Sequence, residues 1–168
     1  MSITHIKTLD GLSRRRSGII PYLMVNKDLY FLLAQDKKTG DFSDFGGHQM
    51  FGETILDTAI REFREESNDI FPSIDSKIKD TSTLIYDDHM VLIFLPVPYV
   101  WSLESDLFSL TPNTEVSHIR WVKKEVLDQM LNRTSTLRLW DKIREFIQQT
   151  NWNNFSLLLE NEWKHHHT

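Results

Sequence analysis

Residues 46–69, GGHQMFGETILDTAIREFREESND, constrain the fold more than any other part of the chain, because a glycine-rich loop runs there directly into a patterned acidic segment. Three of the six glycines of the chain lie in the first seven residues of this stretch. Four apolar side chains that follow recur at the spacing of one helix face: Leu56, Ala59, Ile60 and Phe63. This spacing predicts an amphipathic helix from Thr54 to about Ser67, whose apolar stripe packs on a core.

Both ends of this predicted helix carry capping signals. Thr54 followed by Asp57 resembles a capping box with aspartate in the place of glutamate. Asn68 suits the left-handed residue that follows a helix, because asparagine is second only to glycine in that conformation. The helix is therefore expected to begin and end at defined residues.

Three glutamates of the helix, Glu62, Glu65 and Glu66, lie at i, i+3 and i+4 and therefore share one face. That face borders the apolar stripe, which places the carboxylates at the floor of a cleft. Like charges grouped this way are destabilising unless they are compensated, and hard oxygen ligands suit Mg²⁺ or Mn²⁺. Three glutamates alone would also fit a solvated acidic helix face, so the decision rests on the residues around them.

The spacing of the glycine and charged positions resembles the Nudix box. In this box a glycine is followed after five residues by glutamate and, after seven more, by Arg-Glu-apolar-any-Glu-Glu-any-Gly-apolar. Seven of the nine specified positions match: Gly47, Glu53, Arg61, Glu62, Phe63, Glu65 and Glu66. The two departures are Asn68 for the final glycine and Asp69 for the final apolar residue. Asparagine tolerates the same left-handed backbone as the glycine it replaces.

The resemblance implies an α/β fold, the Nudix-type α/β/α sandwich with a mixed β-sheet. It also implies hydrolysis of a nucleoside diphosphate linked to another group, with Mg²⁺ or Mn²⁺ as the cofactor. Carried over by position, Glu62, Glu65 and Glu66 would be metal ligands, with the carbonyl of Gly46 as a backbone ligand.

The resemblance also implies roles in catalysis. Arg61 and Glu53 would form a charge-assisted pair that holds the loop against the helix and orients the metal-binding carboxylates. Bound metal would lower the pKa of a water molecule that attacks phosphorus, and a general base would take its proton. Glu66, or a glutamate outside the box, is the candidate base. Glu115, just before the VSHIRWV segment, is the best placed of the outside glutamates.

Substrate choice in the family depends on residues outside the box. Tyr86 lies 17 residues after Asp69, where diadenosine-polyphosphate hydrolases tend to carry a tyrosine, and it would stack on a base. Arg16, in a run of three arginines, is either a contact for a phosphate or a solvated charge ahead of the first strand. A nucleoside triphosphate or a dinucleoside polyphosphate is favoured. Removal of the cap from mRNA and nucleotide binding by a non-catalytic Nudix-fold module are the alternatives.

The rest of the chain supplies the elements of one domain. Strands are expected over residues 17–25, 28–35, 81–88, 90–97 and 116–122. A helix is expected from about Lys123 to Leu131, and a last one from about Ser135 to Gln149. The buried side of the last helix would carry Leu137, Trp140, Ile143 and Ile147. This order indicates one α/β domain over residues 1–168, with flexible segments at about 1–13 and 151–168.

Composition narrows the classes of function. The chain has no cysteine, which excludes disulfides and a cysteine nucleophile and fits a reducing compartment. Its net charge of −5 argues against binding long nucleic acid by charge alone, so RNA would enter only through a capped end. The apolar stretch at residues 91–101 is too short to span a bilayer, and no secretory signal is visible. We expect a cytoplasmic protein with a small nucleotide substrate and no membrane partner. The sequence does not indicate the oligomeric state.

Overall fold

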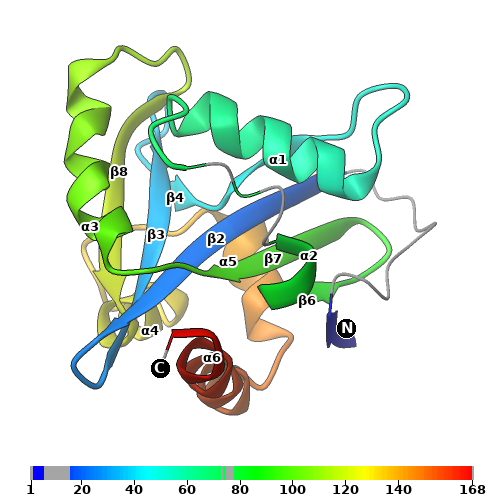
Figure 1. Ribbon diagram of the computed structural model, residues 1–168, viewed down its shortest axis with the longest axis vertical. Helices are drawn as coiled ribbons and strands as arrows, with labels where there is room; N and C mark the ends of the chain where they lie inside the picture. The colour runs from blue at the N-terminus through cyan, green and yellow to red at the C-terminus, as the bar shows by residue number, and fades with distance from the viewer. Residues whose placement is uncertain (1, 6–15, 73, 75–77, 168) are drawn as a thin grey trace.

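The computed structural model of the chain describes residues 2–5, 16–72, 74 and 78–167. Within these residues, eight strands form one sheet in the order β1-β6-β7-β2-β3-β4, with β5 paired to β2 and β8 paired to β3 (Figure 1). The strands are β1 (Ser2–His5), β2 (Arg16–Val25), β3 (Asp28–Asp36), β4 (Phe42–Ser43), β5 (Phe45–His48), β6 (Thr83–Tyr86), β7 (Met90–Pro96) and β8 (Val116–Lys123).

Strand β2 lies at the centre of this sheet. It pairs in parallel with β7 and antiparallel with β3 and β5, and the other pairings between described strands are antiparallel. All of its residues except the last are buried. A strand covered on both faces needs a nearly continuous apolar run, which SGIIPYLMV supplies. The sheet is therefore mixed, as predicted.

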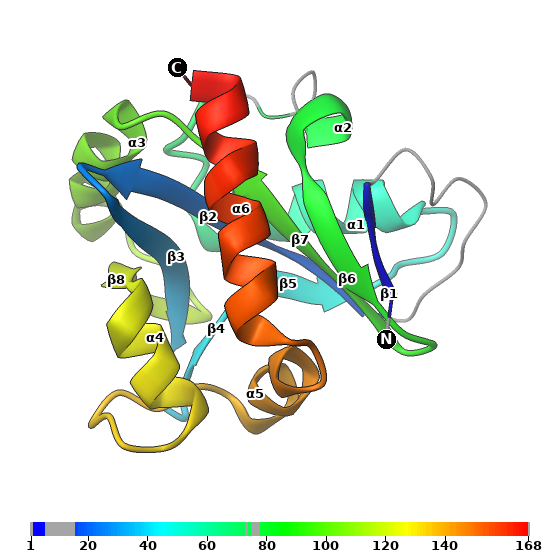
Figure 2. The same ribbon diagram turned by 90° about the horizontal axis from the view of Figure 1, so that it is seen from below.

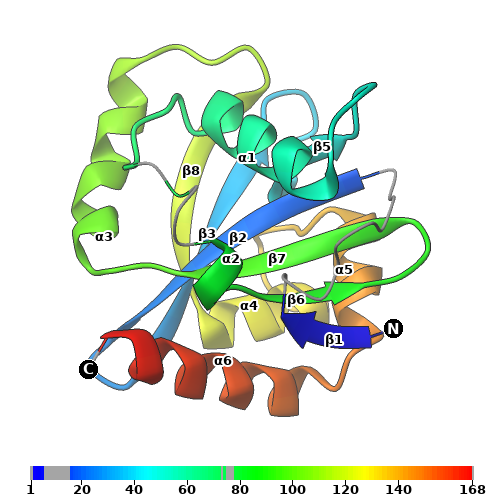
Figure 3. The ribbon, with the colours of Figure 1, turned by 45° about the vertical axis from the view of Figure 1, so that its right-hand side comes forward.

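Helices cover both faces of the sheet, which makes the fold the predicted α/β/α sandwich (Figure 3). The helices are α1 (Ile55–Glu66), α2 (Ile78–Thr81), α3 (Val100–Glu104), the 3₁₀ helix η2 (Ser105–Leu110), α4 (Lys124–Leu131), α5 (Asp141–Gln148) and α6 (Trp152–His167). Buried side chains of α1, α2 and α3 belong to one core cluster, and those of α4, α5 and α6 belong to a second. Figure 2 shows these last three helices together on one face.

An aromatic cluster fills the core beneath α1. The ring centroid of Phe63 lies 5.0 Å from that of Phe45, 5.8 Å from that of Phe71 and 5.9 Å from that of Trp101. Phe71 and Trp101 stack on each other at 4.3 Å. Because Phe45 belongs to β5 and Phe63 to α1, this cluster holds the acidic helix against the glycine-bearing strand.

The predicted start of the helix expected from about Ser135 to Gln149 was wrong. The helix begins at Asp141 rather than near Ser135. The N–H of Phe42 donates to the carbonyl of Arg138, and the N–H of Trp140 donates to the carbonyl of Phe42, both at 2.8 Å. The chain ahead of α5 is therefore held beside β4 by long-range bonds, which local periodicity does not reveal. The other predicted strands and helices are confirmed, with shifts of one or two residues at most of their ends.

Parts of both expected flexible segments form regular secondary structure. From Trp152 the structure has a helix, α6, in which Phe155 and Leu159 are buried. Trp163 Nε1 also donates to the carbonyl of Val97 at 2.9 Å. At the other end β1 pairs with β6, and the remaining residues of the expected segment 1–13 lie outside the described part of the chain. None of the described helices combines the length and apolar character needed to cross a membrane.

Candidate active site

The acidic helix begins and ends as its sequence predicted. The hydroxyl of Thr54 accepts the N–H of Asp57, and the carboxylate of Asp57 accepts the N–H of Thr54, both at 3.1 Å, which completes the capping box. Beyond the helix, Asn68 has a φ of 57° and Asp69 a φ of 52°, so the chain leaves through two left-handed residues. These ends fix which side chains of α1 face the glycine loop.

Arg61 ties the glycine loop to the helix. Its Nε donates to Glu53 Oε2 at 2.7 Å and its Nη2 to Glu53 Oε1 at 3.0 Å, so the pair is bidentate. Nη2 also donates to the carbonyl of His48 at 3.2 Å, and Nη1 donates to Glu62 Oε1 at 2.9 Å. One guanidinium therefore orients both the loop and a carboxylate of the helix.

These contacts keep the pair of Glu53 and Arg61 in its charged form. The hydrogen bond from Arg61 lowers the pKa of Glu53 to about 2, and the N–H of Met50, 2.8 Å from Glu53 Oε1, contributes to this. The hydrogen bond to Glu53 in turn raises the pKa of Arg61. Both groups therefore stay ionised near neutral pH.

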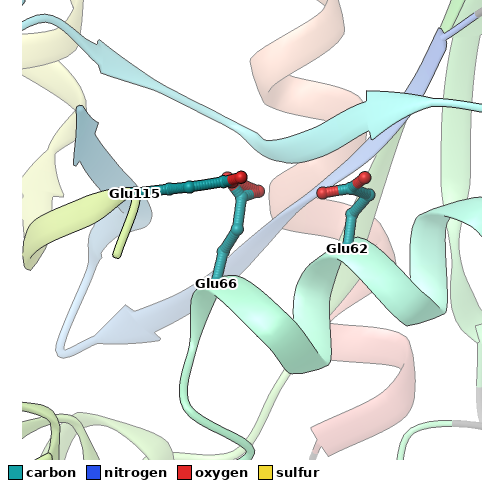
Figure 4. Close-up of side chains that lie close together, drawn as sticks. All are labelled: Glu62, Glu66 and Glu115. Atoms are coloured by element: carbon teal, nitrogen blue, oxygen red, sulfur yellow. The ribbon is translucent and has the colours of Figure 1, made fainter. Parts of the chain in front are cut away.

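Three carboxylates meet beside this pair. Glu62 and Glu66 come from α1, and Glu115 comes from the residue before β8. Each offers an oxygen within 4.8 Å of the others, and Figure 4 shows the Glu115 side chain reaching across to that of Glu66. Oxygen atoms grouped this way are the ligands that Mg²⁺ and Mn²⁺ prefer.

Glu66 differs from the other members of this cluster in the surroundings of its carboxylate. Its Oε1 is buried and has no hydrogen-bond partner among the described residues. Burial, followed by the negative charges of Asp44 and Glu62, raises the pKa of Glu66 to about 9, against the opposing effect of Arg16. An ionised carboxylate without a partner is destabilising in such surroundings. A divalent cation would compensate it, so the residues present fit such an ion.

A buried ion pair lies next to this cluster. Arg16 Nη1 and Nη2 donate to the two carboxylate oxygens of Asp44 at 2.8 and 2.7 Å, and both residues are buried. The Arg16 guanidinium also lies 4.9 Å from the ring centroid of Trp140. Burial alone would lower the pKa of Arg16, but the charge and hydrogen bonds of Asp44 raise it overall. Arg16 therefore stays positively charged, which partly offsets the carboxylates of α1.

Two glycines of the loop are required by what they face. A β-carbon on Gly47 would overlap the carboxylate of Glu62. A β-carbon on Gly46 would lie 2.8 Å from both the Cα of Gly18 and the carbonyl oxygen of Ser17. Gly47 therefore leaves room for a carboxylate, and Gly46 leaves room for the backbone of β2.

Alanine at these two positions is expected to have different effects. Gly47→Ala displaces only the end of the Glu62 side chain, so it should weaken Mn²⁺ binding roughly tenfold or more and leave stability within about 1 kcal/mol. Gly46→Ala presses against backbone and should lower the free energy of unfolding by about 1–3 kcal/mol. Titration calorimetry with Mn²⁺ and urea unfolding of both variants measure this. A Gly47→Ala protein that binds Mn²⁺ as the wild type does would argue against Glu62 as a ligand.

Two of the three carboxylates, Glu66 and Glu115, line a cleft of about 670 Å³, a volume suited to a nucleotide-sized ligand. Its walls come from β2, β3, β4 and β5, the loop between β3 and β4, the end of α1, the start of β8 with the segment before it, and the residue before α5. The side chains on these walls include Arg16, Lys38, His48, Glu66, Glu115 and Trp140. Gly46 also lines the cleft, beside two of the grouped carboxylates.

Two predicted site residues lie apart from this cluster. The side chain of Glu65 is 59% exposed, and its carboxylate accepts from Arg61 Nη1 at 3.4 Å. Tyr86 lies in β6 and packs partly against the core beneath α1, and it is not among the described residues that line the cleft. Arg16 does line the cleft, although its guanidinium is already paired with Asp44.

Asp44 and Trp140 are two residues of the site that sequence reasoning missed. Asp44 stands between Phe42 and Phe45, and a charged residue in a stretch that becomes buried is a signal that a partner is needed. Its partner, Arg16, lies 28 residues away, so the sequence could not identify it. Trp140 was expected on the buried side of a helix, and no local signal places its ring at the cleft.

Comparison with known proteins identifies the family. The sequence profile of the NUDIX domain matches residues 13–149. The fold is similar to that of RenU, a Nudix hydrolase from M. smegmatis, with a TM-score of 0.55 at 16% identity over 85% of this chain and 86% of that one. A mutT/nudix family protein from Listeria innocua gives a TM-score of 0.50 at 16% identity, over 86% and 96% of the two chains. The chain therefore belongs to the Nudix family.

A curated relative is similar over a shorter stretch. Uncharacterized protein L534 of Acanthamoeba polyphaga mimivirus is 44% identical over an alignment of 63 residues that covers 34% of this chain. The match covers 20% of the length of that relative. This similarity gives no information on a substrate.

Proposed function

We propose that the protein is a hydrolase that cleaves a phosphoanhydride bond in a nucleoside diphosphate-linked substrate, with Mg²⁺ or Mn²⁺ as its cofactor. The observation that carries this proposal is the cluster of Glu62, Glu66 and Glu115, of which Glu66 and Glu115 line a nucleotide-sized cleft. The buried, unpartnered oxygen of Glu66 supports it, because a bound cation would compensate the charge of that carboxylate when it is ionised. Membership of the Nudix family agrees with this chemistry.

The roles of the side chains follow from their positions. Glu62, Glu66 and Glu115, with the carbonyl of Gly46, are the groups that would hold the cation. When bound, the cation lowers the pKa of a water molecule and withdraws charge from the phosphate oxygens. Arg61 holds Glu62 in place through its 2.9 Å hydrogen bond. Glu66 and Glu115 are the two carboxylates positioned to accept the proton that the attacking water releases.

The remaining walls of the cleft support a nucleotide as the substrate. Lys38 supplies a cation for a phosphate away from the carboxylates. Trp140 is the large aromatic side chain among the described residues that line the cleft, so it replaces Tyr86 as our candidate for stacking on a base. A nucleoside triphosphate or a dinucleoside polyphosphate is the substrate we favour.

The test is phosphate-product release by the full-length protein with Mg²⁺ or Mn²⁺. The panel contains nucleoside triphosphates, diadenosine polyphosphates, ADP-ribose and capped RNA, and the Glu66→Gln protein runs beside the wild type as the control for contaminating enzymes. We expect one of the first two classes to be hydrolysed, and this activity to disappear both with EDTA and in the variant.

Other outcomes of this assay would favour the alternatives. Hydrolysis of capped RNA alone would identify a decapping enzyme. Tight, saturable nucleotide binding without hydrolysis of any substrate would identify a non-catalytic binding module.

A further inference from the structure

An asparagine links the end of α1 to the segment that carries Glu115. Asn113 Nδ2 donates to the carbonyl of Glu65 at 2.9 Å and to Asn68 Oδ1 at 2.7 Å. Asn113 Oδ1 accepts the backbone N–H groups of Glu115 and Val116, both at 2.9 Å. One amide therefore holds the last turn of α1 at one end and the backbone of Glu115 at the other.

Asn68 completes this link, at the position where the chain departs from the glycine of the Nudix box. Its φ of 57° lies in the left-handed region that glycine adopts without steric strain. Unlike glycine, it has a side chain that donates from Nδ2 to the carbonyl of Thr111 at 2.8 Å and accepts from Asn113. The substitution thus keeps the backbone conformation and adds two hydrogen bonds. We refer to Asn68 and Asn113 as the asparagine clamp.

The carboxylate cluster has a physical need for such a clamp. Glu66 is carried by a helix, whereas Glu115 lies in an exposed segment that is distant in sequence. A cation site needs both carboxylates in their ionised form, and two ionised carboxylates repel each other, so an untethered Glu115 would move away from Glu66. Outside the clamp, the carbonyl of Glu115 accepts the N–H of Lys37 at 2.8 Å.

We infer that Asn68 and Asn113 are positioning residues that hold Glu115 against Glu66, so that the grouped carboxylates form one cation site. This inference rests on the proposed function, which assigns the cation to the cluster. The clamp is separate from what holds the fold together. Both asparagines are partly exposed, and β8 pairs independently with β3 from Tyr30 to Asp36.

Asn68→Gly is the sharpest test, because glycine keeps the left-handed backbone and removes only the side-chain bonds. Asn113→Ala removes the other half of the clamp. Asn132→Ala is the matched control: Asn132 also follows a helix, α4, and its Oδ1 accepts from the N–H and hydroxyl of Thr134. Asn132 is not among the described residues that line the cleft.

The quantity to measure is the dissociation constant for Mn²⁺, by calorimetry on the full-length protein without substrate. We expect it to rise roughly tenfold or more in Asn68→Gly and Asn113→Ala and to stay unchanged in Asn132→Ala. In a Glu115→Gln background, Asn68→Gly should have no further effect, because residue 115 then carries no charged carboxylate for the clamp to position. Thermal unfolding followed by circular dichroism checks that each variant is folded.

Two results would overturn the inference. One is a wild-type Mn²⁺ affinity in both folded clamp variants, and the other is an equal loss of affinity with and without Glu115. Failure of the proposed function is distinguishable from these results. In that case the wild type binds Mn²⁺ with an affinity that depends on the clamp, but it hydrolyses no member of the substrate panel.

Discussion

Glu66→Gln is expected to remove most of the hydrolytic activity. In the absence of metal, the variant should also be more stable than the wild type above neutral pH. Both effects come from the same carboxylate. Glutamine has nearly the same shape but carries no charge and accepts no proton, so the rate should fall roughly 10²–10⁴-fold if Glu66 is a ligand or the base. The fold should survive, because Glu66 Oε1 makes no hydrogen bond with any described residue.

The stability effect depends on pH because the pKa of Glu66 is raised, from 4.5 to about 9. Between these values the folded chain keeps a proton that the unfolded chain has released. The free energy of unfolding therefore falls as pH rises, by at most about 1.4 kcal/mol per pH unit from this group. The stability that Glu66 contributes is fully present below its pKa in the unfolded chain, 4.5, and is lost as pH rises through its pKa in the folded chain, about 9. Glutamine does not titrate, so the variant lacks this pH dependence.

Urea unfolding in EDTA at about pH 6 and about pH 9 measures this difference. The wild type should lose more stability than Glu66→Gln between the two conditions. Glu65→Gln is the matched control, because Glu65 is exposed and paired with Arg61, and that variant should follow the wild type. Addition of Mn²⁺ should then stabilise the wild type by mass action and stabilise Glu66→Gln much less. If the wild type and Glu66→Gln lose the same stability between the two pH values, the pKa of Glu66 is not raised in the metal-free protein.

The part of the site that the sequence predicted is the part built by local geometry. Glu62 and Glu66 share a helix face because they are one turn apart, and the ends of α1 follow from Thr54 and Asn68. The match to the Nudix box added the bidentate contact between Arg61 and Glu53, which the structure contains. Helical periodicity and a motif of fixed spacing need no knowledge of distant residues, which is why these features were accessible.

The features that were missed or misplaced depend on contacts between distant segments. Asp44 is held by Arg16, and its carboxylate lies where a β-carbon on Gly18 would be. The start of α5 is set by hydrogen bonds to Phe42, and the ring of Trp140 is at the cleft for the same reason. No window of the sequence contains both members of these contacts, so propensity and periodicity could not predict them.

Phe63→Ala is expected to destabilise the protein by about 3–5 kcal/mol, the typical effect of removing a fully buried phenylalanine. Phe63 is 2% exposed, and its ring contacts those of Phe45, Phe71 and Trp101. Alanine would leave a cavity between α1 and β5 that these three rings cannot easily fill. Because the same contact holds the acidic helix against the glycine strand, Mn²⁺ affinity should fall as well.

Phe51→Ala is the matched control, since Phe51 precedes the same helix but is fully exposed, at 107% relative accessibility. Its effect on the free energy of unfolding should stay within about 0.5 kcal/mol, as for surface substitutions in general. Urea unfolding of both variants and the wild type, with a common m-value, gives the comparison. Equal stability of the two variants would mean that α1 does not bury the face carrying Phe63, and the position of Glu62 and Glu66 beside Glu115 would be wrong with it. A loss confined to Phe63→Ala ties the position of the carboxylates to the packing beneath them, because both lie on the same two turns of one helix.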